Sequence, residues 1–311
     1  MGLSDLPRAI GARTRSNGAE ETCGVPGYEF TLALTHDVDR PYKRAAHALF
    51  YAYRDRDPEQ LRGLAPWSNP YWLFDDIVSL EEELGVRSSF YFLREKSMTE
   101  RPPREWLEPR YWIEHLGRYD VADPDVARLI RRLDEGRWEI GLHGSYSSYD
   151  DPERLRTEKA LLESVLGREV IGGRQHCLNL DAPDTWRYHA DVGLRYDSTL
   201  GSSSTYGFHH GYCPLRPFDD EFVVFPLTLM ERTLPKVRSD PEGAWLECEN
   251  LLREASDNGA VMTVLWHPTY LDPERRPEYR ALYRRLIERA QELGGWVGPL
   301  EAVYESLDHP E

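Results

Sequence analysis

The chain has 311 residues and a hydrophobic content of 40%, which allows one large α/β barrel or two ordinary domains with a sizeable core. Its net charge of −16 disfavours nucleic acid and anionic membrane surfaces as partners. No apolar run is long enough to span a bilayer, and residues 1–24 lack the apolar core of a secretory signal, so we expect a soluble cytoplasmic protein.

Four cysteines are spread along the chain without a Cys-x-x-Cys pair. They are Cys23, Cys177, Cys213 and Cys248. Widely spaced cysteines in a cytoplasmic protein are typical of reduced thiols rather than of a disulfide framework or a thiolate zinc site. We therefore expect free thiols.

Residues 1–26 contain Gly, Ser, Arg and Pro without hydrophobic periodicity, and we expect a mobile lead-in there. From residue 27 to residue 311, apolar runs typical of buried strands alternate with helix patterns. Strands are predicted at 30–39, 86–93, 138–142, 170–173, 194–198, 222–230, 260–266 and 296–300. Helices are predicted at 69–84, 123–133, 151–166, 183–192, 240–256 and 277–293, followed by a short last helix.

Polar residues followed by proline mark the starts of four of these helices. They are Asn69, Asp123, Asp151 and Asp240. An Asn or Asp side chain accepts hydrogen bonds from the first free N–H groups of a helix, and proline suits the first turn. Two long connections, 94–119 and 201–221, are predicted to be loops. Loops of this length often form functional lids or walls.

Strand and helix patterns alternate along the whole of residues 27–311. Such alternation is typical of a parallel sheet covered by helices. Seven or eight repeats predict a closed or nearly closed barrel, that is, a (β/α)7–8 TIM-like barrel of the α/β class. Because no linker or shift in composition divides this region, we expect a single domain.

The first predicted strand ends in two carboxylates. Side chains of a strand alternate between its faces, so Thr35, Asp37 and Asp39 share one face and His36 points the other way, towards the core. Each carboxylate raises the pKa of the other unless a cation lies between them. A metal ion or a nearby arginine would supply that cation, whereas a solvated acidic turn is the alternative explanation.

Further polar residues follow the other predicted strands, at the point where each strand ends. The full set is Asp37, Asp39, His143, Arg174, His176, Asp197 and His267. The carboxyl ends of parallel barrel strands meet at one mouth, which is where the active sites of such barrels lie. Each residue alone has an ordinary structural explanation, but their joint placement predicts one site.

The predicted site has the composition of a metal-dependent hydrolase. Asp39, His143 and His176 form a set of one carboxylate and two imidazoles that suits Zn²⁺, and also Co²⁺, Ni²⁺ or Fe²⁺. Asp37 is predicted to be the base that takes a proton from water, and Arg174 to hold that base ionised. His267 would protonate a leaving nitrogen. Asp197 is predicted to orient His267 or Arg174, or to cap a turn.

Four motifs of the chain resemble those of the polysaccharide deacetylase family, also called the NodB-homology or carbohydrate esterase 4 family. The motifs are Thr35-His36-Asp37-Val38-Asp39, His143-Gly144-Ser145-Tyr146-Ser147, Arg174, and Leu265-Trp266-His267. The resemblance covers about residues 29–300. It implies a distorted (β/α) barrel that removes N-acetyl or related acyl groups with a divalent metal. It also implies that Asp37 is the base, Asp39 and His143 are metal ligands, Arg174 orients the base and His267 is the acid.

The chain departs from the second motif of that family. The motif carries a second metal histidine, and Ser147 stands in its place. His176 is the candidate to supply the missing ligand, because it leaves the neighbouring strand two residues after Arg174 and shares its face.

Three functions are compatible with these residues. The first is a hydrolase that removes an N-acyl group from a carbohydrate or a sugar-containing intermediate. The second is an amidase or allantoinase-like hydrolase of a non-sugar C–N bond in a small molecule. The third is a non-catalytic binding protein on a degenerate barrel. An open mouth with aromatic side chains would favour glycans. We expect Trp67, Trp72, Trp106 and Trp112 to be mostly core residues, with one or two of them contributing to such a wall. A closed mouth with arginine would favour small acidic amides.

Overall fold

The computed structural model describes residues 23–43, 49, 52–53, 69–108, 111–112, 115, 118–218 and 221–307. Within this part of the chain, nine strands form one sheet in the order β6-β5-β4-β3-β2-β1-β8-β7, and β9 also pairs with β1. All of these strand pairs are parallel. The strands are β1 (Thr31–Val38), β2 (Ser89–Leu93), β3 (Glu139–Gly144), β4 (Gly172–Gln175), β5 (Tyr196–Asp197), β6 (Val223–Val224), β7 (Leu227–Met230), β8 (Val261–Leu265) and β9 (Trp296–Gly298).

The sheet curls until its two edges approach each other. Strands β6 and β7 lie at opposite ends of the strand order, yet only Phe225 and Pro226 separate them in the chain. The prediction of a single strand at 222–230 was therefore wrong. Pro226 has no N–H to donate to a ladder. Before this proline β6 pairs with β5, and after it β7 pairs with β8. The predicted distorted (β/α) barrel is confirmed.

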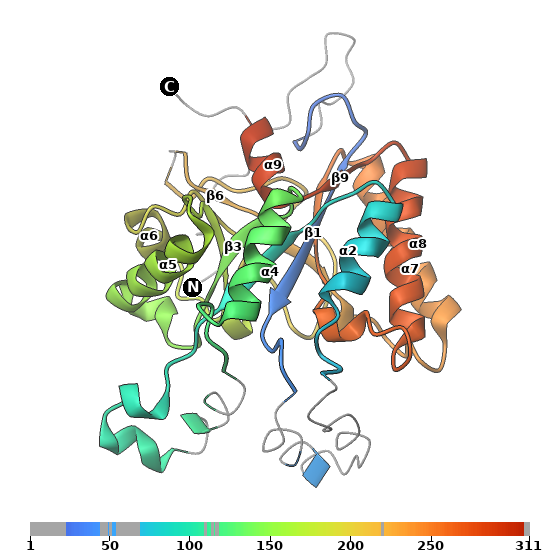
Figure 1. Cartoon of the computed structure of the whole chain (residues 1–311). Coiled ribbons are helices and arrows are strands. Elements are labelled where there is room, and N and C mark those ends of the chain that lie inside the picture. The colour runs from blue at the N-terminus through green and yellow to red at the C-terminus, as the bar shows by residue number, and fades with distance from the viewer. Residues whose placement is uncertain are drawn as a thin grey trace.

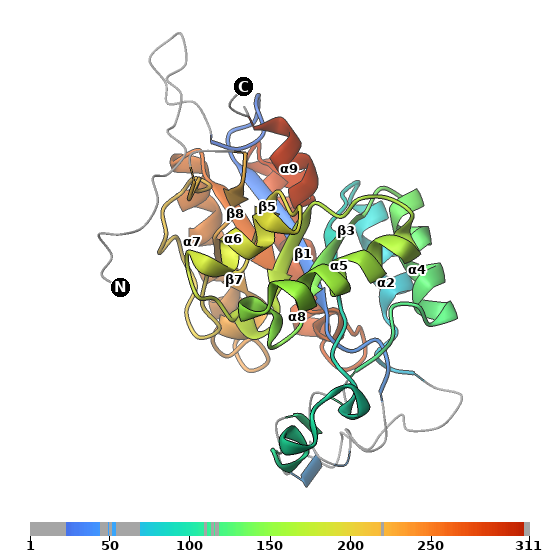
Figure 2. The same cartoon turned by 90° about the vertical axis from the view of Figure 1, so that its left-hand side faces the viewer.

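Helices cover the outside of the curled sheet, as the two perpendicular views in Figures 1 and 2 show. They are α2 (Phe74–Glu83), α4 (Pro124–Glu135), α5 (Pro152–Leu166), α6 (Asp184–Asp191), α7 (Pro241–Asp257), α8 (Pro277–Glu292) and α9 (Leu300–Ser306). Helix α9 lies at the amino-terminal end of the strands, where the backbone N–H of Leu300 donates to Ser89 Oγ at 2.9 Å. The opposite end, towards which the β1 arrow points in Figure 1, is the mouth of the barrel.

The alternation along β1 decides which of its side chains face the mouth. Leu32, Leu34 and Val38 pack into the large core beneath the helices, whereas Ala33 belongs to the smaller cluster inside the barrel. Residues of odd number therefore point inwards, and this places Asp37 inside the barrel, where it is only 4% exposed.

Three of the four predicted helix starts are confirmed. The side chains of Asp123, Asp151 and Asp240 each accept a hydrogen bond from a backbone N–H of the first helical turn, with proline next. The start at Asn69 was wrong, because α2 begins at Phe74. The Asn69 side chain instead braces the loop after β1, where its Nδ2 donates to the carbonyl of Pro41 at 2.8 Å.

The expectation of four free thiols was wrong for two of the cysteines. Cys23 and Cys213 form a disulfide between residues 190 positions apart, with their Cα atoms 5.4 Å apart. Both approach the start of β8, since Cys23 N donates to Gly259 O and Val261 N donates to Tyr212 O. This proximity depends on tertiary structure that cysteine spacing does not encode. Cys177 and Cys248 are free thiols, as expected.

Two further predictions concern the N-terminal lead-in and membrane-spanning segments. Most of the predicted lead-in, residues 1–22, lies outside the described residues. Among the residues that the structure describes, no helix is long and apolar enough to cross a membrane.

Candidate active site

The polar residues that follow the strands meet at the mouth of the barrel. Asp37 lies near the end of β1 and Asp39 directly after it. His143 lies near the end of β3, and Arg174 and His176 lie within and directly after β4. His267 follows β8 and begins the short 3-10 turn η8 (Pro268–Tyr270).

Asp37 and Arg174 form a buried ion pair. Arg174 Nη1 lies 2.8 Å from Asp37 Oδ1 and 2.9 Å from Thr35 Oγ1, and the guanidinium is fully buried. Its other nitrogens donate to Ser198 O at 2.8 Å and to Ser198 Oγ at 2.9 Å. Burial raises the pKa of the Asp37 carboxyl, but Arg174, followed by His143 and His267, outweighs burial and lowers that pKa overall. Asp37 is therefore held ionised in a fixed orientation.

Three imidazoles surround Asp39, and each has its Nδ1 fixed by a neighbouring acceptor. His143 Nδ1 lies 2.9 Å from the carbonyl oxygen of Arg174, and His176 Nδ1 lies 3.2 Å from Glu95 Oε1. His267 Nδ1 lies 2.8 Å from Glu231 Oε1. Carbonyl and carboxylate oxygens only accept hydrogen bonds, so Nδ1 of each ring carries a proton, and His143 and His176 present the lone pair of Nε2 when they are neutral.

The three Nε2 atoms all point towards Asp39. Those of His143 and His176 lie 3.2 Å and 3.8 Å from Asp39 Oδ1, and that of His267 lies 3.7 Å from Asp39 Oδ2. Asp39 Oδ1 is buried and accepts no well-directed hydrogen bond within the described residues. Lone pairs of two neutral imidazoles facing a carboxylate repel each other unless a cation lies between them.

The donor set fits a divalent metal ion. One ligand atom each of Asp39, His143 and His176 can be chosen so that all three lie within 4.8 Å of one another. One carboxylate and two imidazoles suit Zn²⁺ and related ions, and three protein ligands leave positions open for water or substrate. The fixed Nδ1 atoms resemble the outer hydrogen bonds that orient metal-bound histidines.

The electrostatic field of the cluster favours positive charge on His267. Burial lowers the pKa of the His267 imidazole, but Glu231, together with Asp39 and Asp37, outweighs burial and raises it to about 9. For Asp39, burial raises the pKa of the carboxyl, whereas His143, His176 and His267 lower it by more. The cluster is thus arranged around an ionised carboxylate with cationic or metal partners.

Asp197 lies behind the site, in contact with other residues. Its Oδ1 accepts hydrogen bonds from Trp186 Nε1 at 3.1 Å and from Thr199 N at 2.9 Å. Its Oδ2 lies 3.2 Å from His189 Nδ1. The contact with Thr199 corresponds to the predicted capping of a turn. The contacts with Trp186 and His189 join Asp197 to helix α6 rather than to His267.

Two acidic residues at the site were missed in the sequence. Glu231 directly follows β7 and is fully buried, and Glu95 lies two residues beyond β2 and is 3% exposed. Both meet the criterion that located the other residues, namely a polar side chain just past the end of a predicted strand. Applying it to every strand would have found them.

His36 occupies the core behind the site, as predicted. Its Nδ1 lies 2.5 Å from the carbonyl oxygen of Trp266, and its Nε2 lies 2.9 Å from Glu81 Oε1. Tyr283 and Glu81 complete this buried polar group through a 2.7 Å hydrogen bond. The contact with Trp266 joins β1 to the residue before His267.

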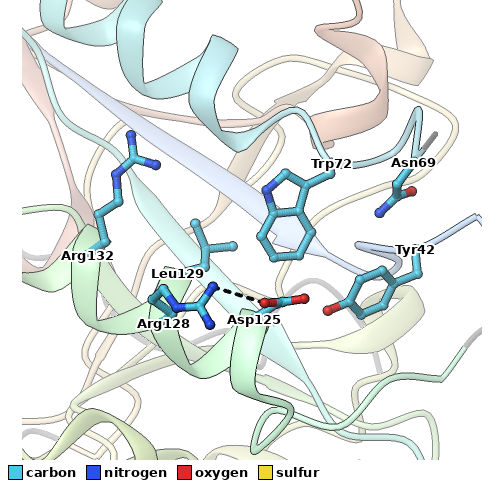
Figure 3. Close-up of a pocket in the computed structure, with 7 residues that line it drawn as sticks. All are labelled: Tyr42, Asn69, Trp72, Asp125, Arg128, Leu129 and Arg132. Carbon is cyan, nitrogen blue, oxygen red and sulfur yellow. Dashed lines mark hydrogen bonds and ion pairs between the residues drawn. The ribbon is translucent and has the colours of Figure 1, made fainter. Parts of the chain in front are cut away.

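A groove of about 520 Å³ lies beside the mouth, between α4 and the segment that leads into α2. Figure 3 shows its lining: Tyr42, Asn69, Trp72, Asp125, Arg128, Leu129 and Arg132. The rings of Tyr42 and Trp72 stack with centroids 5.6 Å apart, and Tyr42 is three residues beyond Asp39 in the chain. The groove contains none of the site residues.

The other tryptophans considered for a substrate wall have different positions. Trp106 and Trp112 lie on the connection after β2 and are 46% and 45% exposed. Trp67 lies outside the described residues.

The sequence matches no family profile and no curated protein. Its structure is similar to that of a candidate polysaccharide deacetylase from Mycobacterium smegmatis, with 20% identity, coverage of 98% of this chain and 99% of the other, and a TM-score of 0.59. It is similar to PuuE allantoinase, with 15% identity, 97% coverage of both chains and a TM-score of 0.58. For a candidate polysaccharide deacetylase from Pseudomonas aeruginosa PAO1 the values are 15% identity, 90% and 91% coverage, and a TM-score of 0.56. The chain therefore has the fold found in polysaccharide deacetylases, the family whose motifs its sequence resembles.

Proposed function

We propose that the protein is a metal-dependent hydrolase that removes an N-acyl group, most simply N-acetyl, from a carbohydrate. The observation that carries this proposal is the Asp37–Arg174 pair next to the Asp39, His143 and His176 cluster. A binding protein would need neither a base held ionised by a buried arginine nor an imidazole tied to a buried carboxylate on the other side of Asp39.

Each residue has a role that follows from its contacts. A divalent ion held by Asp39, His143 and His176 would lower the pKa of a water molecule and polarise the acyl oxygen. Asp37 Oδ1 is occupied by Arg174, so Oδ2 is the atom that accepts the proton from water. His267 gives a proton to the leaving nitrogen as the C–N bond breaks. The proton comes from Nε2, because the Nδ1 proton is held in the hydrogen bond to Glu231. Glu231 is thus a positioning residue.

The groove beside the mouth supports a carbohydrate substrate. Its lining includes the stacked, half-buried rings of Tyr42 and Trp72. It also includes Asp125 and Arg128, whose side chains are bonded to each other at 3.0 Å. Aromatic rings beside paired polar groups suit sugar rings, which have apolar faces and hydroxyl edges. A sugar chain held in the metal site would reach this groove along the loop that follows Asp39.

A second candidate is the hydrolysis of a C–N bond in a small acidic amide. The observation that favours it is Arg276, whose guanidinium lies 3.9 Å from the ring centroid of Tyr270. The Tyr270 ring is in turn 6.4 Å from that of His267. A cation on this side of the mouth would attract a carboxylate near the scissile bond.

The disulfide bears on where such a reaction would take place. Disulfides persist mainly in oxidising compartments. The Cys23–Cys213 bond therefore favours a compartment of that kind over the cytoplasmic location predicted from the sequence.

The experiment is a metal analysis followed by a substrate panel. Purified protein is stripped with a chelator, reloaded with Zn²⁺ or Co²⁺, and assayed on N-acetylglucosamine oligomers and on allantoin. The proposal predicts about one ion per chain and acetate release from the oligomers, and Asp37→Asn should retain the metal without turnover. Turnover of allantoin alone would favour the second candidate. If the protein binds no metal, the proposal is refuted, and the replacement of the motif histidine by Ser147 would favour a non-catalytic binding protein.

A further inference from the structure

One of the residues proposed to bind the metal, His176, comes from a different strand than the family motif implies. Ser147, at the position of the second motif histidine, precedes the 3-10 turn η5 (Ser148–Asp150), beyond the end of β3. His176 directly follows β4, and its ring centroid lies 5.3 Å from that of His143. A histidine at this place needs its own means of orientation, because it stands on a different backbone segment.

The backbone around His176 adopts an unusual conformation. Cys177 and Leu178, which follow it, have φ angles of 60° and 55°. Residues other than glycine rarely occupy this left-handed region, because Cβ then crowds the neighbouring carbonyl oxygen. Contacts elsewhere must therefore hold the turn that presents His176 to the mouth.

Glu95 provides the contact that fixes the ring. The carboxylate lies beyond the end of β2, and its Oε1 is 3.2 Å from His176 Nδ1. The same oxygen accepts a hydrogen bond of 2.7 Å from the backbone N–H of Tyr146, which belongs to the segment after His143. Glu95 thus connects the ends of three strands, β2, β3 and β4.

Two buried arginines hold the other oxygen of this carboxylate. Glu95 Oε2 lies 3.2 Å from Arg154 Nη2, on helix α5, and 3.7 Å from Arg101 Nη2, on the connection after β2. Arg154 also contacts Glu158 Oε1 at 2.8 Å. With both oxygens engaged, the carboxylate has no freedom to rotate away from His176.

We propose that Glu95 is a positioning residue that makes His176 a metal ligand in place of the missing histidine at position 147. An ionised carboxylate accepts hydrogen bonds only, so it fixes the proton on Nδ1 and leaves the Nε2 lone pair facing Asp39. In this pair, His176 contributes the donor atom, and Glu95 fixes the tautomer and the orientation of the His176 ring. This inference rests on the metal site of the proposed function.

The test is metal affinity in a Glu95→Gln variant. Glutamine keeps the size of the side chain but removes the charge and offers an N–H₂ group that competes with the imidazole proton. Removing such an outer partner typically weakens metal binding by about 10–100-fold, and we expect a loss of this size for Zn²⁺ in competition with a chromophoric chelator. The matched control is Glu158→Gln, because Glu158 is buried and bound to Arg154 but contacts Ser145 rather than His176. The control should bind Zn²⁺ as the wild type does.

A second measurement does not depend on a variant that folds. In wild-type protein loaded with Zn²⁺, ¹⁵N NMR of the histidine rings should show the His176 proton on Nδ1. Unchanged Zn²⁺ affinity in folded Glu95→Gln overturns the inference while leaving the metal site intact. A proton on Nε2 also overturns it and removes His176 from the metal ligands. An equal loss of affinity in Glu158→Gln also overturns it, since the effect would then belong to the whole ion network. Wild-type protein that binds no Zn²⁺ refutes both this inference and the proposed function.

Discussion

The ion pair of Asp37 and Arg174 can be tested by a double-mutant cycle in the free energy of unfolding. Removing one partner of a buried pair typically costs about 3–5 kcal/mol, because the other charge is left buried without a partner. Asp37→Asn should lie near the lower end, about 3 kcal/mol, since Arg174 keeps its hydrogen bonds to Thr35 and Ser198. Arg174→Met should cost about 5 kcal/mol, because Ser198 O also loses its buried donor.

The double variant separates the charge interaction from these other losses. With both charges gone, no unpaired ion remains, and we expect a total cost of about 5 kcal/mol rather than the sum of about 8. The coupling energy is then about 3 kcal/mol, near the upper end for residues in contact. Arg174→Lys is the matched control: it keeps the charge but not the planar fork, so it should destabilise the protein less than Arg174→Met.

The assay is urea unfolding of the wild type, the two single variants and the double variant at one pH. Each variant is also assayed for turnover, and all lacking Asp37 or Arg174 should be inactive. Costs that add to within about 0.5 kcal/mol would mean that the two charges are not coupled. Arg174 would then not be what holds Asp37 ionised, and the assignment of Asp37 as the base would lose its physical support.

Three further changes test other parts of the structure. His176→Ala should lose bound metal as completely as His143→Ala, whereas Ser147→Ala should keep it; elemental analysis after dialysis measures this, and metal retained in His176→Ala would remove His176 from the ligands. Burial, and after it Glu301, raises the pKa of the buried Glu139 carboxyl from 4.5 to about 7. Because the folded state binds this proton more tightly than the unfolded chain, the stability due to Glu139 is greatest below about pH 4.5 and is lost as the pH rises to about 7. Wild-type protein should therefore lose about 3 kcal/mol relative to Glu139→Gln between pH 4.5 and 8 in urea unfolding, and parallel curves would contradict this. Trp72→Ala should raise KM for N-acetylglucosamine oligomers about fivefold, the equivalent of about 1 kcal/mol of ring contact, and leave the monosaccharide unaffected; equal effects on both would exclude the groove as a binding site.

Local sequence signals predicted the framework of the protein well where one residue decides one feature. An aspartate before a proline caps α4, α5 and α7, because a cap needs only its own side chain and the next turn. The signal failed at Asn69, where the same side chain is used by the loop after β1. It also failed in the predicted strand at 222–230, because the sequence does not reveal that the two halves pair with strands at opposite edges of the sheet.

The candidate site was predictable to the extent that it depends on strand ends. The strands of a parallel barrel all end at one mouth, so His143, Arg174 and His267 could be placed together without knowing which strands are neighbours. The partners of these residues are different. Glu95 reaches from β2 past β3 to His176 after β4, and this contact depends on how the strand ends curl towards one another. The Cys23–Cys213 disulfide was missed for the same reason.

The register of β3 and β4 is compatible with the proposal that His176 takes the place of a ligand after β3. His143 pairs with Arg174, and Gly144 with Gln175, so His176 stands level with the residue just beyond β3. Neighbouring strands are about 4.8 Å apart, a distance similar to the reach of a histidine side chain from its Cα. A ring that leaves the end of β4 two residues beyond the level of His143 can therefore reach the carboxylate that a ring from the segment after β3 would reach. What it needs in addition is a fixed tautomer, and the carboxylate of Glu95, whose Oε1 lies 3.2 Å from Nδ1, is placed to supply it.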